Sequence, residues 1–501
     1  MTTSSDPADT EIRGLSPIPL LLLSLILCGL AGAMAWGIRG QFGHETGAMI
    51  FGPLVGFTLV MLYFPGGNSL KGARAVALLS MAVGIGGSMS YGETIGLTQD
   101  YEVHRQLVVN EAGEKVYEKQ WNDAAYWWGM LGLAIKGGLW MGVAGLFLGM
   151  GLGDKAYDPL EIFLMMIAAV LLLIGGIWLL NTPYQPAERI LPYLYFSDDW
   201  RWEPAEFVNP RPENWGGVLL PYIAGLLYLQ LVRKDRLGVL LGLWGFVAGL
   251  GFPIGQSLQA ANAFDPDGFR ELLPIYIGKN SWNLMECTFG LVAGTVFGFA
   301  VWFHRNRISR SAGAEPVTMP LNWEICLLLA YLFVFIIGWR YEESALGRFH
   351  EFGLVMAVVP ATGIIGGRYW PFLYALPVVA MPIAVKAFRA VGLGSESVPS
   401  LIPTHVAWPL IIALPLLLLT VLAIYWARRS EQDNSASRMG AWLLLATTAC
   451  YYVFNFLLER FPWHWFADWT LQTPTGMIYF YAWLILSIAA ILVLVKTKRS
   501  V

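Results

Sequence analysis

The feature that most constrains this chain is a succession of long apolar segments between about residues 17 and 495, separated by short polar connections. A bilayer core needs about 20 mostly apolar residues per helix, and lipid forces each segment to satisfy its own backbone hydrogen bonds. The composition agrees, because 56% of the 501 residues are hydrophobic and 13% are charged, against about 25% charged in soluble domains. The sequence predicts an all-α, polytopic integral membrane protein. It excludes a soluble enzyme, a secreted disulfide scaffold and a nucleic-acid binder.

Length and hydropathy predict about fourteen spans. They leave a disordered N-terminal segment (1–16), one transmembrane domain (17–495) and a basic tail (496–501). The stretch 352–388 fits either two short helices or a broken, re-entrant pair. The spans are expected to begin near Pro17, Ala48, Ala75, Ala124, Ile162, Gly216, Leu237, Asn283, Ile325, Phe352, Pro371, Ala407, Met439 and Gly476.

Lysine and arginine collect in every second loop, and basic loops stay on the cytoplasmic side. Lys71 and Arg74 lie in the first such loop, and 233–236, 305–310 and 428–438 follow. Both termini are therefore expected in the cytoplasm, in a cell (inner) membrane. The outward loops are longer and more acidic. Ala33-Met34-Ala35 resembles a signal-peptidase site, but the segment before it is acidic where a signal peptide is basic.

Small residues recur within the spans. Many of the 54 glycines are four residues apart, as in Gly145/Gly149 and Gly290/Gly294, a spacing that lets helices approach closely. Three helix pairs share a pattern of glycine and charge, which suggests duplicated helical hairpins. The four cysteines lie in apolar segments, so no disulfide framework is expected.

The outward loops are rich in aromatic residues, above all Asn181–Trp215 and Phe461–Phe466. One interpretation is an interfacial belt, where amphipathic rings settle at headgroup depth. The other is a stacking surface for sugar rings, or a lid over a lipid headgroup.

Ionisable and amide side chains within the spans gather toward the outward side. Such residues are costly in lipid and usually mark function. Lys136 is expected near mid-depth, with Glu286 as its best partner and Glu93 and Glu45 next. The candidate catalytic residues are His44, Glu45, Glu93 and Glu286, and the candidate substrate-binding residues are Arg39, Lys136, Gln256, Asn283, Arg340 and His350.

Motifs for nucleotide or metal chemistry are missing. The sequence has no Gly-Lys-Ser/Thr phosphate loop, no His-Glu-x-x-His and no Cys-x-x-Cys. Asp265-Pro266-Asp267 has the form of a metal-bound phosphosugar site, but a turn is the better interpretation. No metal site is predicted, and no cofactor is indicated.

Two functions compete. The first is a membrane-embedded transferase that moves a glycosyl group to or from a lipid-linked substrate, with a pocket open to the outer face. A glutamate would be the general base, Arg39 and Lys136 would bind phosphate, and His44 or His350 would relay protons. The alternative is a secondary transporter of a small polar or anionic solute; a binding or assembly protein remains a third class. A polar path from Lys136 to the cytoplasm would favour transport. The expected partners are the bilayer and a lipid-linked or small polar substrate.

Overall fold

The structure is a computed structural model. It describes residues 16–42, 49–64, 69–87, 91–99, 105–119, 122–197, 210–273, 281–309, 402–432, 435–453 and 474–498, with single residues and short pieces between them. The spans expected near Phe352 and Pro371, and the question of a re-entrant pair, lie outside these residues. Of the span near Ile325, only scattered positions are described.

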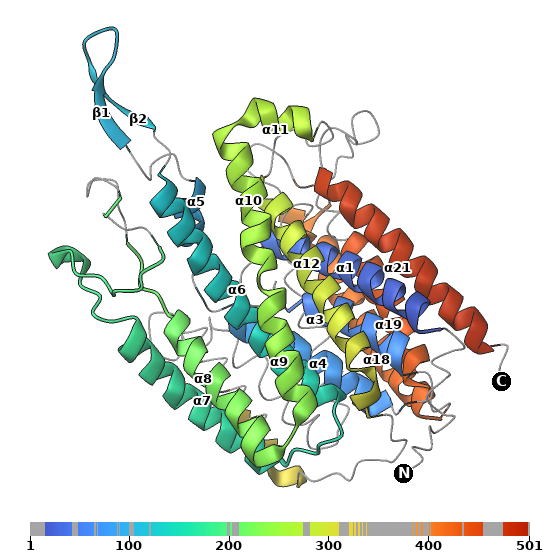
Figure 1. The fold of residues 1–501 in the computed structure, drawn as a ribbon. Coiled ribbons are helices and arrows are strands. Elements are labelled where there is room, and N and C mark those ends of the chain that lie inside the picture. Colours follow the sequence, from blue (N-terminus) through green and yellow to red (C-terminus); the bar gives the residue numbers. More distant parts are fainter. Residues whose placement is uncertain are drawn as a thin grey trace.

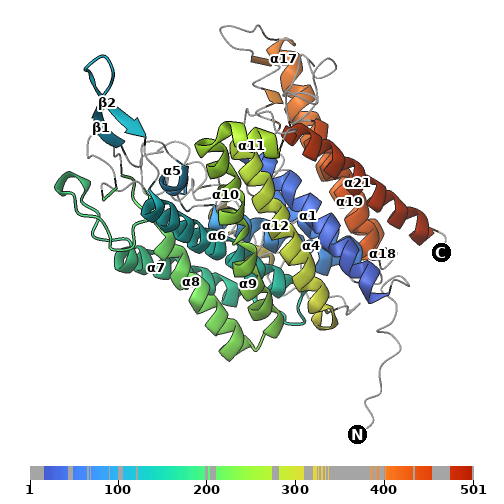
Figure 2. The ribbon, with the colours of Figure 1, turned by 45° about the horizontal axis from the view of Figure 1, so that its top comes forward.

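The described part of the chain is a bundle of helices (Figure 1). In the first half lie α1 (Pro17–Phe42), α3 (Phe51–Tyr63), α4 (Ser69–Gly86), α5 (Gly92–Gln99), α6 (Asp123–Leu152) and α7 (Pro159–Leu180). After them come α8 (Trp215–Leu227), α9 (Arg236–Ala248), α10 (Gly251–Phe264), α11 (Pro266–Leu272), α12 (Ser281–Phe303), α17 (Thr404–Ala407), α18 (Leu414–Gln432), α19 (Ala436–Tyr452) and α21 (Pro474–Lys498). In Figure 2, α7 and α8 form one flank and α18, α19 and α21 the other.

Within the described residues, nine helical segments are long and apolar enough to cross a membrane. One of them, Arg236–Phe264, combines α9 and α10, and the shorter α3 is also apolar. The prediction of a multi-pass helical membrane protein is confirmed at this level. The number fourteen and the cytoplasmic placement of the termini remain predictions.

Polar side chains fix where several helices begin. The Asn122 side chain accepts hydrogen bonds from the backbone N–H groups of Ala124 and Ala125 at the start of α6. Asp158 and Glu161 form a capping box at the start of α7. Asp265 accepts from the N–H of Gly268 at 2.9 Å and caps α11. Asp265-Pro266-Asp267 is therefore the start of a short helix and not the predicted turn.

A two-stranded hairpin lies in the connection between α5 and α6, where no strand was predicted. Strand β1 (Arg105–Val109) pairs antiparallel with β2 (Lys115–Lys119), with Arg105 opposite Lys119. Gly113 closes the turn with a φ of 79°, a conformation that glycine adopts at little cost. The hairpin extends away from the helices (Figure 1).

Several basic loops lie together at one end of the bundle, named here the basic end. The Lys71 ammonium donates to the Gly153 carbonyl at 2.9 Å, and the Ser309 N–H donates to the Leu152 carbonyl at 3.0 Å. The Trp302 indole donates to the Pro17 carbonyl at 2.9 Å. The opposite end, named the loop end, holds the hairpin, α5 and α11 (Figure 1). The predicted grouping of basic residues agrees with this arrangement, but Lys71 and Arg74, which were expected in a loop, lie buried inside α4.

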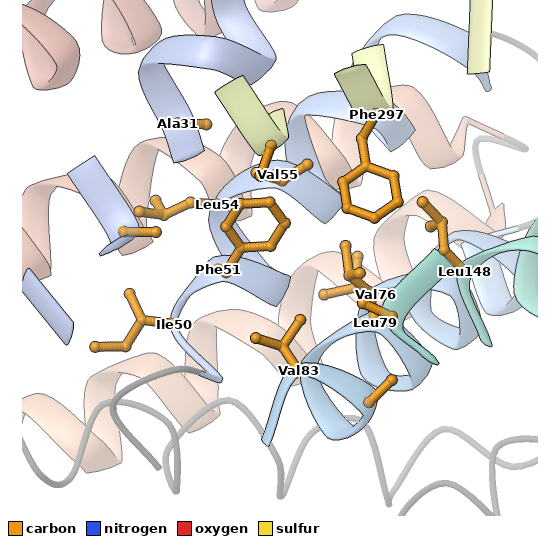
Figure 3. Close-up of a cluster of buried hydrophobic side chains, with 14 of the residues drawn as sticks. Ala31, Ile50, Phe51, Leu54, Val55, Val76, Leu79, Val83, Leu148 and Phe297 are labelled. Atoms are coloured by element: carbon orange, nitrogen blue, oxygen red, sulfur yellow. The ribbon is translucent and has the colours of Figure 1, made fainter. Parts of the chain in front are cut away.

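Glycines let the helices pack closely. A Cβ at Gly145 of α6 would overlap the Leu241 carbonyl of α9, and one at Gly294 of α12 would overlap the Cys28 carbonyl of α1. The close packing expected from the glycine spacing is confirmed. Between these pairs, apolar side chains of α3, α4, α6 and α12 interdigitate (Figure 3).

Candidate functional site: a buried polar layer at the loop end

Lys136 lies inside α6 and its side chain is 1% exposed. Its ammonium donates to Glu213 Oε1 at 2.7 Å and to Thr94 Oγ1 at 2.7 Å. A charge buried in a spanning helix needs such partners, because lipid and apolar side chains provide none. The predicted burial of Lys136 is confirmed.

The partner of Lys136 differs from the prediction. Glu213 precedes α8 in the loop after α7, and its carboxylate also accepts from the Ser197 hydroxyl at 2.8 Å and from the Phe196 N–H at 3.0 Å. The expected pairing of Lys136 with Glu286 is therefore wrong. The reason is that the loop folds back into the bundle, so a residue expected outside the spans reaches the depth of Lys136.

Aromatic side chains attach this loop to the bundle. Tyr195 and Phe196 are fully buried, and the Trp128 indole of α6 donates to the Tyr195 carbonyl at 2.6 Å. The Phe196 ring lies 5.2 Å from that of Trp128 and 5.7 Å from that of Trp215. These rings form a core under the loop, whereas Tyr193 in the same loop is exposed.

A second ion pair lies above the first, where it reaches solvent. Arg211 Nε is 2.9 Å from Glu93 Oε1, and the two side chains are 63% and 22% exposed. The Arg211 backbone is held by Tyr195, whose hydroxyl donates to the Arg211 carbonyl and accepts from its N–H. Glu93 is a predicted site residue, whereas Arg211 was missed because nothing in its loop sequence distinguishes it from a connector.

Amide and carboxyl side chains form a further group between α10 and α12, named here the amide layer: Gln256, Gln259, Asn283 and Glu286. All four are at most 4% exposed. The Gln256 side-chain nitrogen donates to Thr98 Oγ1 of α5 at 2.7 Å, which joins the layer to the helix that carries Thr94 and Glu93. Three of the four are predicted site residues, and Gln259 was missed.

Five aromatic rings close into a circuit, named here the aromatic ring, in the order Trp36, Trp140, Tyr91, Phe252 and Phe289. Successive centroids around it are 5.1, 5.9, 4.9, 4.9 and 4.4 Å apart. All five side chains are buried, and they come from α1, α6, α10, α12 and the residue before α5. Trp140 follows Lys136 by four residues, and Gln256 follows Phe252 by four, so the polar groups lie about one helical turn closer to the loop end.

Beyond the aromatic ring, toward the basic end, α6 is apolar. After Lys136, α6 contains only glycine and apolar or tryptophan residues up to Leu152. The Thr58 and Ser80 hydroxyls donate to carbonyls of their own helices, at Leu54 and Val76. Charged side chains reappear with Arg74 and Lys71 of α4, where Lys71 donates to the Gly153 carbonyl at the end of α6.

Several predicted site residues lie outside what the structure describes: His44, Glu45, Arg340 and His350. Arg39 is in α1, but nothing is described of its side chain. The sequence predicts that the predicted site residues meet in one outward cavity, and the structure describes the positions of only some of them. Glu93 precedes Thr94 in α5, and Lys136 donates to Thr94. Gln256, Asn283 and Glu286 belong to the amide layer.

In the described part of the chain, no three His, Cys, Asp or Glu residues are grouped as metal ligands would be. Comparisons with protein-family models, with curated proteins and with solved structures find no match to this chain. The fold and site define a helical, multi-pass membrane protein with a buried polar layer near one end, and its function must be argued from these residues.

Proposed function

We propose that this protein is a membrane-embedded group transferase that acts at the outward face of a cell membrane. Glycosyl transfer from a lipid-linked donor is the first reaction to test. The observation that supports it is the one-sided polar layer. Lys136, Glu213 and the amide layer lie toward the loop end, and the aromatic ring and the glycine-rich part of α6 after Lys136 lie beneath them. A site reached from one side suits an enzyme better than a carrier.

Glu93 is the proposed general base, because it is the carboxylate of the site that is partly exposed. It would take the proton of an acceptor hydroxyl as the hydroxyl oxygen bonds to the anomeric carbon. The bond from that carbon to the donor phosphate breaks, and the phosphate leaves with the electron pair. The proton on Glu93 then passes to water.

Arg211 is the proposed binding group for the phosphate. Lys136 was the first candidate, but its charge is already matched by Glu213. The Arg211 guanidinium is exposed beside Glu93, and guanidinium groups bind phosphate through paired hydrogen bonds. Lys136 and Glu213 then act as positioning residues that hold the loop. Glu286 is a second carboxylate for the same site, and Arg39, His44, Glu45, Arg340 and His350 keep their predicted roles as candidates.

The test is an assay of the purified full chain in liposomes with polyprenyl-phosphate-linked sugars that carry a radiolabel in the sugar. Wild type should transfer label to a new product, and Glu93→Gln should be slower by about 100-fold or more, the usual contribution of a general base. Glu111→Gln, on the exposed hairpin turn, is the matched control and should transfer at the wild-type rate. Equal rates for Glu93→Gln and wild type would remove Glu93 as the base.

One observation favours a secondary transporter of a small anionic solute as the second candidate. Buried charge pairs with hydroxyl neighbours, such as Lys136 and Glu213 with Thr94 and Ser197, mark solute and proton pathways in many membrane proteins. The same liposomes separate the two functions when they receive, in separate assays, the lipid-linked sugar and a water-soluble radiolabelled sugar phosphate. Label that accumulates inside the vesicles in unchanged form indicates transport, whereas label in a new compound indicates transfer.

A further inference from the structure

Gln259 in the amide layer has an unusual environment. Its side chain is fully buried, yet within the described structure neither amide atom has a hydrogen-bond partner. The side-chain oxygen of the neighbouring Gln256 also has none. Buried amides are almost always bonded, so an unbonded one needs an explanation other than packing. A leucine would fill the same space at lower cost.

The surroundings of Gln259 limit what it can bind. Gln256 and Gln259 lie on one face of α10, three residues apart, and Asn283 and Glu286 are three apart on α12. The two helices are in close contact here, because a Cβ on Gly255 would overlap the Met285 carbonyl. One turn below, the Phe252 and Phe289 rings stack with centroids 4.9 Å apart at an angle of 4°. The layer thus combines three amides and one carboxyl group above an aromatic pair.

We propose that the amide layer binds an uncharged, polyhydroxylated group, a sugar ring above all. This inference deepens the proposed transferase function and rests on it. Each amide offers both donors and acceptors, and each sugar hydroxyl needs both. The aromatic rings beneath offer an apolar surface to the C–H face of a sugar.

Other ligand classes fit less well. An anion would meet the Glu286 carboxyl group and no cation within the layer. A hard metal cation would find one carboxyl group among neutral amides, where calcium sites use several carboxylates. An organic cation would suit the rings and Glu286 but would leave the amide donors unbonded.

Ligand entry requires the four side chains to turn aside, because they fill the layer in this structure. Gln259 is the side chain best suited to move, since it breaks no hydrogen bond when it does. Gln256 would exchange its bond to Thr98 for one to the ligand.

The experiment measures the thermal stability of the full chain, purified in a polyoxyethylene detergent so that no sugar headgroup is present. Glucose, galactose, mannose and N-acetylglucosamine are titrated separately, with potassium phosphate and tetramethylammonium chloride as the anion and cation comparators. At least one sugar should raise the melting temperature saturably, while the two salts should not. Saturable shifts with either salt and none with sugars would overturn the proposal.

The decisive variant is Gln259→Leu. It should melt at or above the wild-type temperature, because it removes unbonded polar atoms, and its sugar affinity should fall about tenfold or more. Gln230→Leu, at an exposed position in the segment after α8, is the matched control and should bind sugar as wild type does. A destabilised Gln259→Leu that still binds sugar would show that Gln259 has only a structural role.

Glu93→Gln separates this inference from the proposed function. Glu93 lies outside the amide layer, so this variant should bind sugar normally even though transfer is lost. Sugar binding by the wild type without any transfer would refute the transferase and leave the binding site. Transfer with normal kinetics in Gln259→Leu would refute the binding site and leave the transferase.

Discussion

At the residue scale, the ion pair between Lys136 and Glu213 is the feature with the largest energetic consequence. Removing one charge leaves the other buried without its partner, which costs about 3–5 kcal/mol. Lys136→Met and Glu213→Gln should each destabilise the protein by that order, and the double variant should lose less than the sum. Chemical unfolding in detergent measures the three values.

The pair Lys155 and Asp154, 3.9 Å apart with side chains 36% and 71% exposed, is the control for that cycle. Its removal should cost less than about 1 kcal/mol, as for most surface pairs. Additive losses for Lys136→Met and Glu213→Gln would contradict a direct interaction between them.

His304 predicts a pH dependence at the basic end. It follows α12, and its Nε2 lies 3.2 Å from the Trp244 indole nitrogen, which donates to it. Burial, and then the charges of Arg307 and Arg236, lower the pKa of His304 below its ordinary value. A histidine with a lowered pKa in the folded state stabilises the fold fully above its unfolded pKa of about 6.5, and this contribution is lost as the pH falls through the folded value.

The measurement is the melting temperature of wild type and His304→Gln between pH 8 and pH 5. Glutamine keeps an acceptor for Trp244 and does not titrate. The wild type should therefore lose stability relative to the variant as the pH is lowered. A constant difference between the two proteins across this range would contradict the role of His304.

The ion pair also shows which features of the site could be predicted from the sequence alone. The depth of Lys136 followed from its position within an apolar span, and its burial was predicted correctly. Its partner was not, because hydropathy assigns Glu213 to a loop and says nothing about loops that fold back. The one available signal was that Glu213 stands just before the span expected near Gly216, at the membrane boundary.

At the element scale, the glycine contacts predict sharply different outcomes for the same substitution. Gly145→Ala and Gly294→Ala would push a Cβ into backbone carbonyls of α9 and α1 and should each cost about 1–3 kcal/mol, the range for overpacking. Gly175 of α7 has nothing within 4 Å of the position of a Cβ. Gly175→Ala should be neutral or stabilising by up to about 1 kcal/mol, because alanine favours helix. Thermal unfolding of the three variants in one detergent tests this, and equal effects at all three positions would contradict the packing.

Elements with a strong periodic or apolar signal were predictable, and the hairpin was not. The helices α6 and α12 follow from long apolar segments with regular glycines. The hairpin lies in a polar connection, and its signals were the β-branched pair Val108 and Val109 and the turn at Gly113. A polar two-stranded hairpin buries little apolar surface, so hydrophobic patterning predicts it only weakly.

At the scale of the whole molecule, the arrangement of charge predicts the orientation in the membrane. The basic end gathers Lys71, the 233–236 loop and the segment after α12, and basic loops of this length remain in the cytoplasm. The loop end, with the hairpin, α11 and the candidate site, should then face outward. This orientation decides which side a substrate must come from.

Single cysteines placed at the two ends test that orientation in intact cells, in a background where Cys326, the exposed native cysteine, is replaced by serine. Cysteines at Glu111 and Asp267, both exposed at the loop end, should react with a membrane-impermeant maleimide added outside. Cysteines at Lys234 and Arg307 should react only after the membrane is opened. The opposite pattern would place the polar layer on the cytoplasmic side, where a substrate presented from outside could not reach Glu93 and Arg211, and the proposed outward reaction would fail with it.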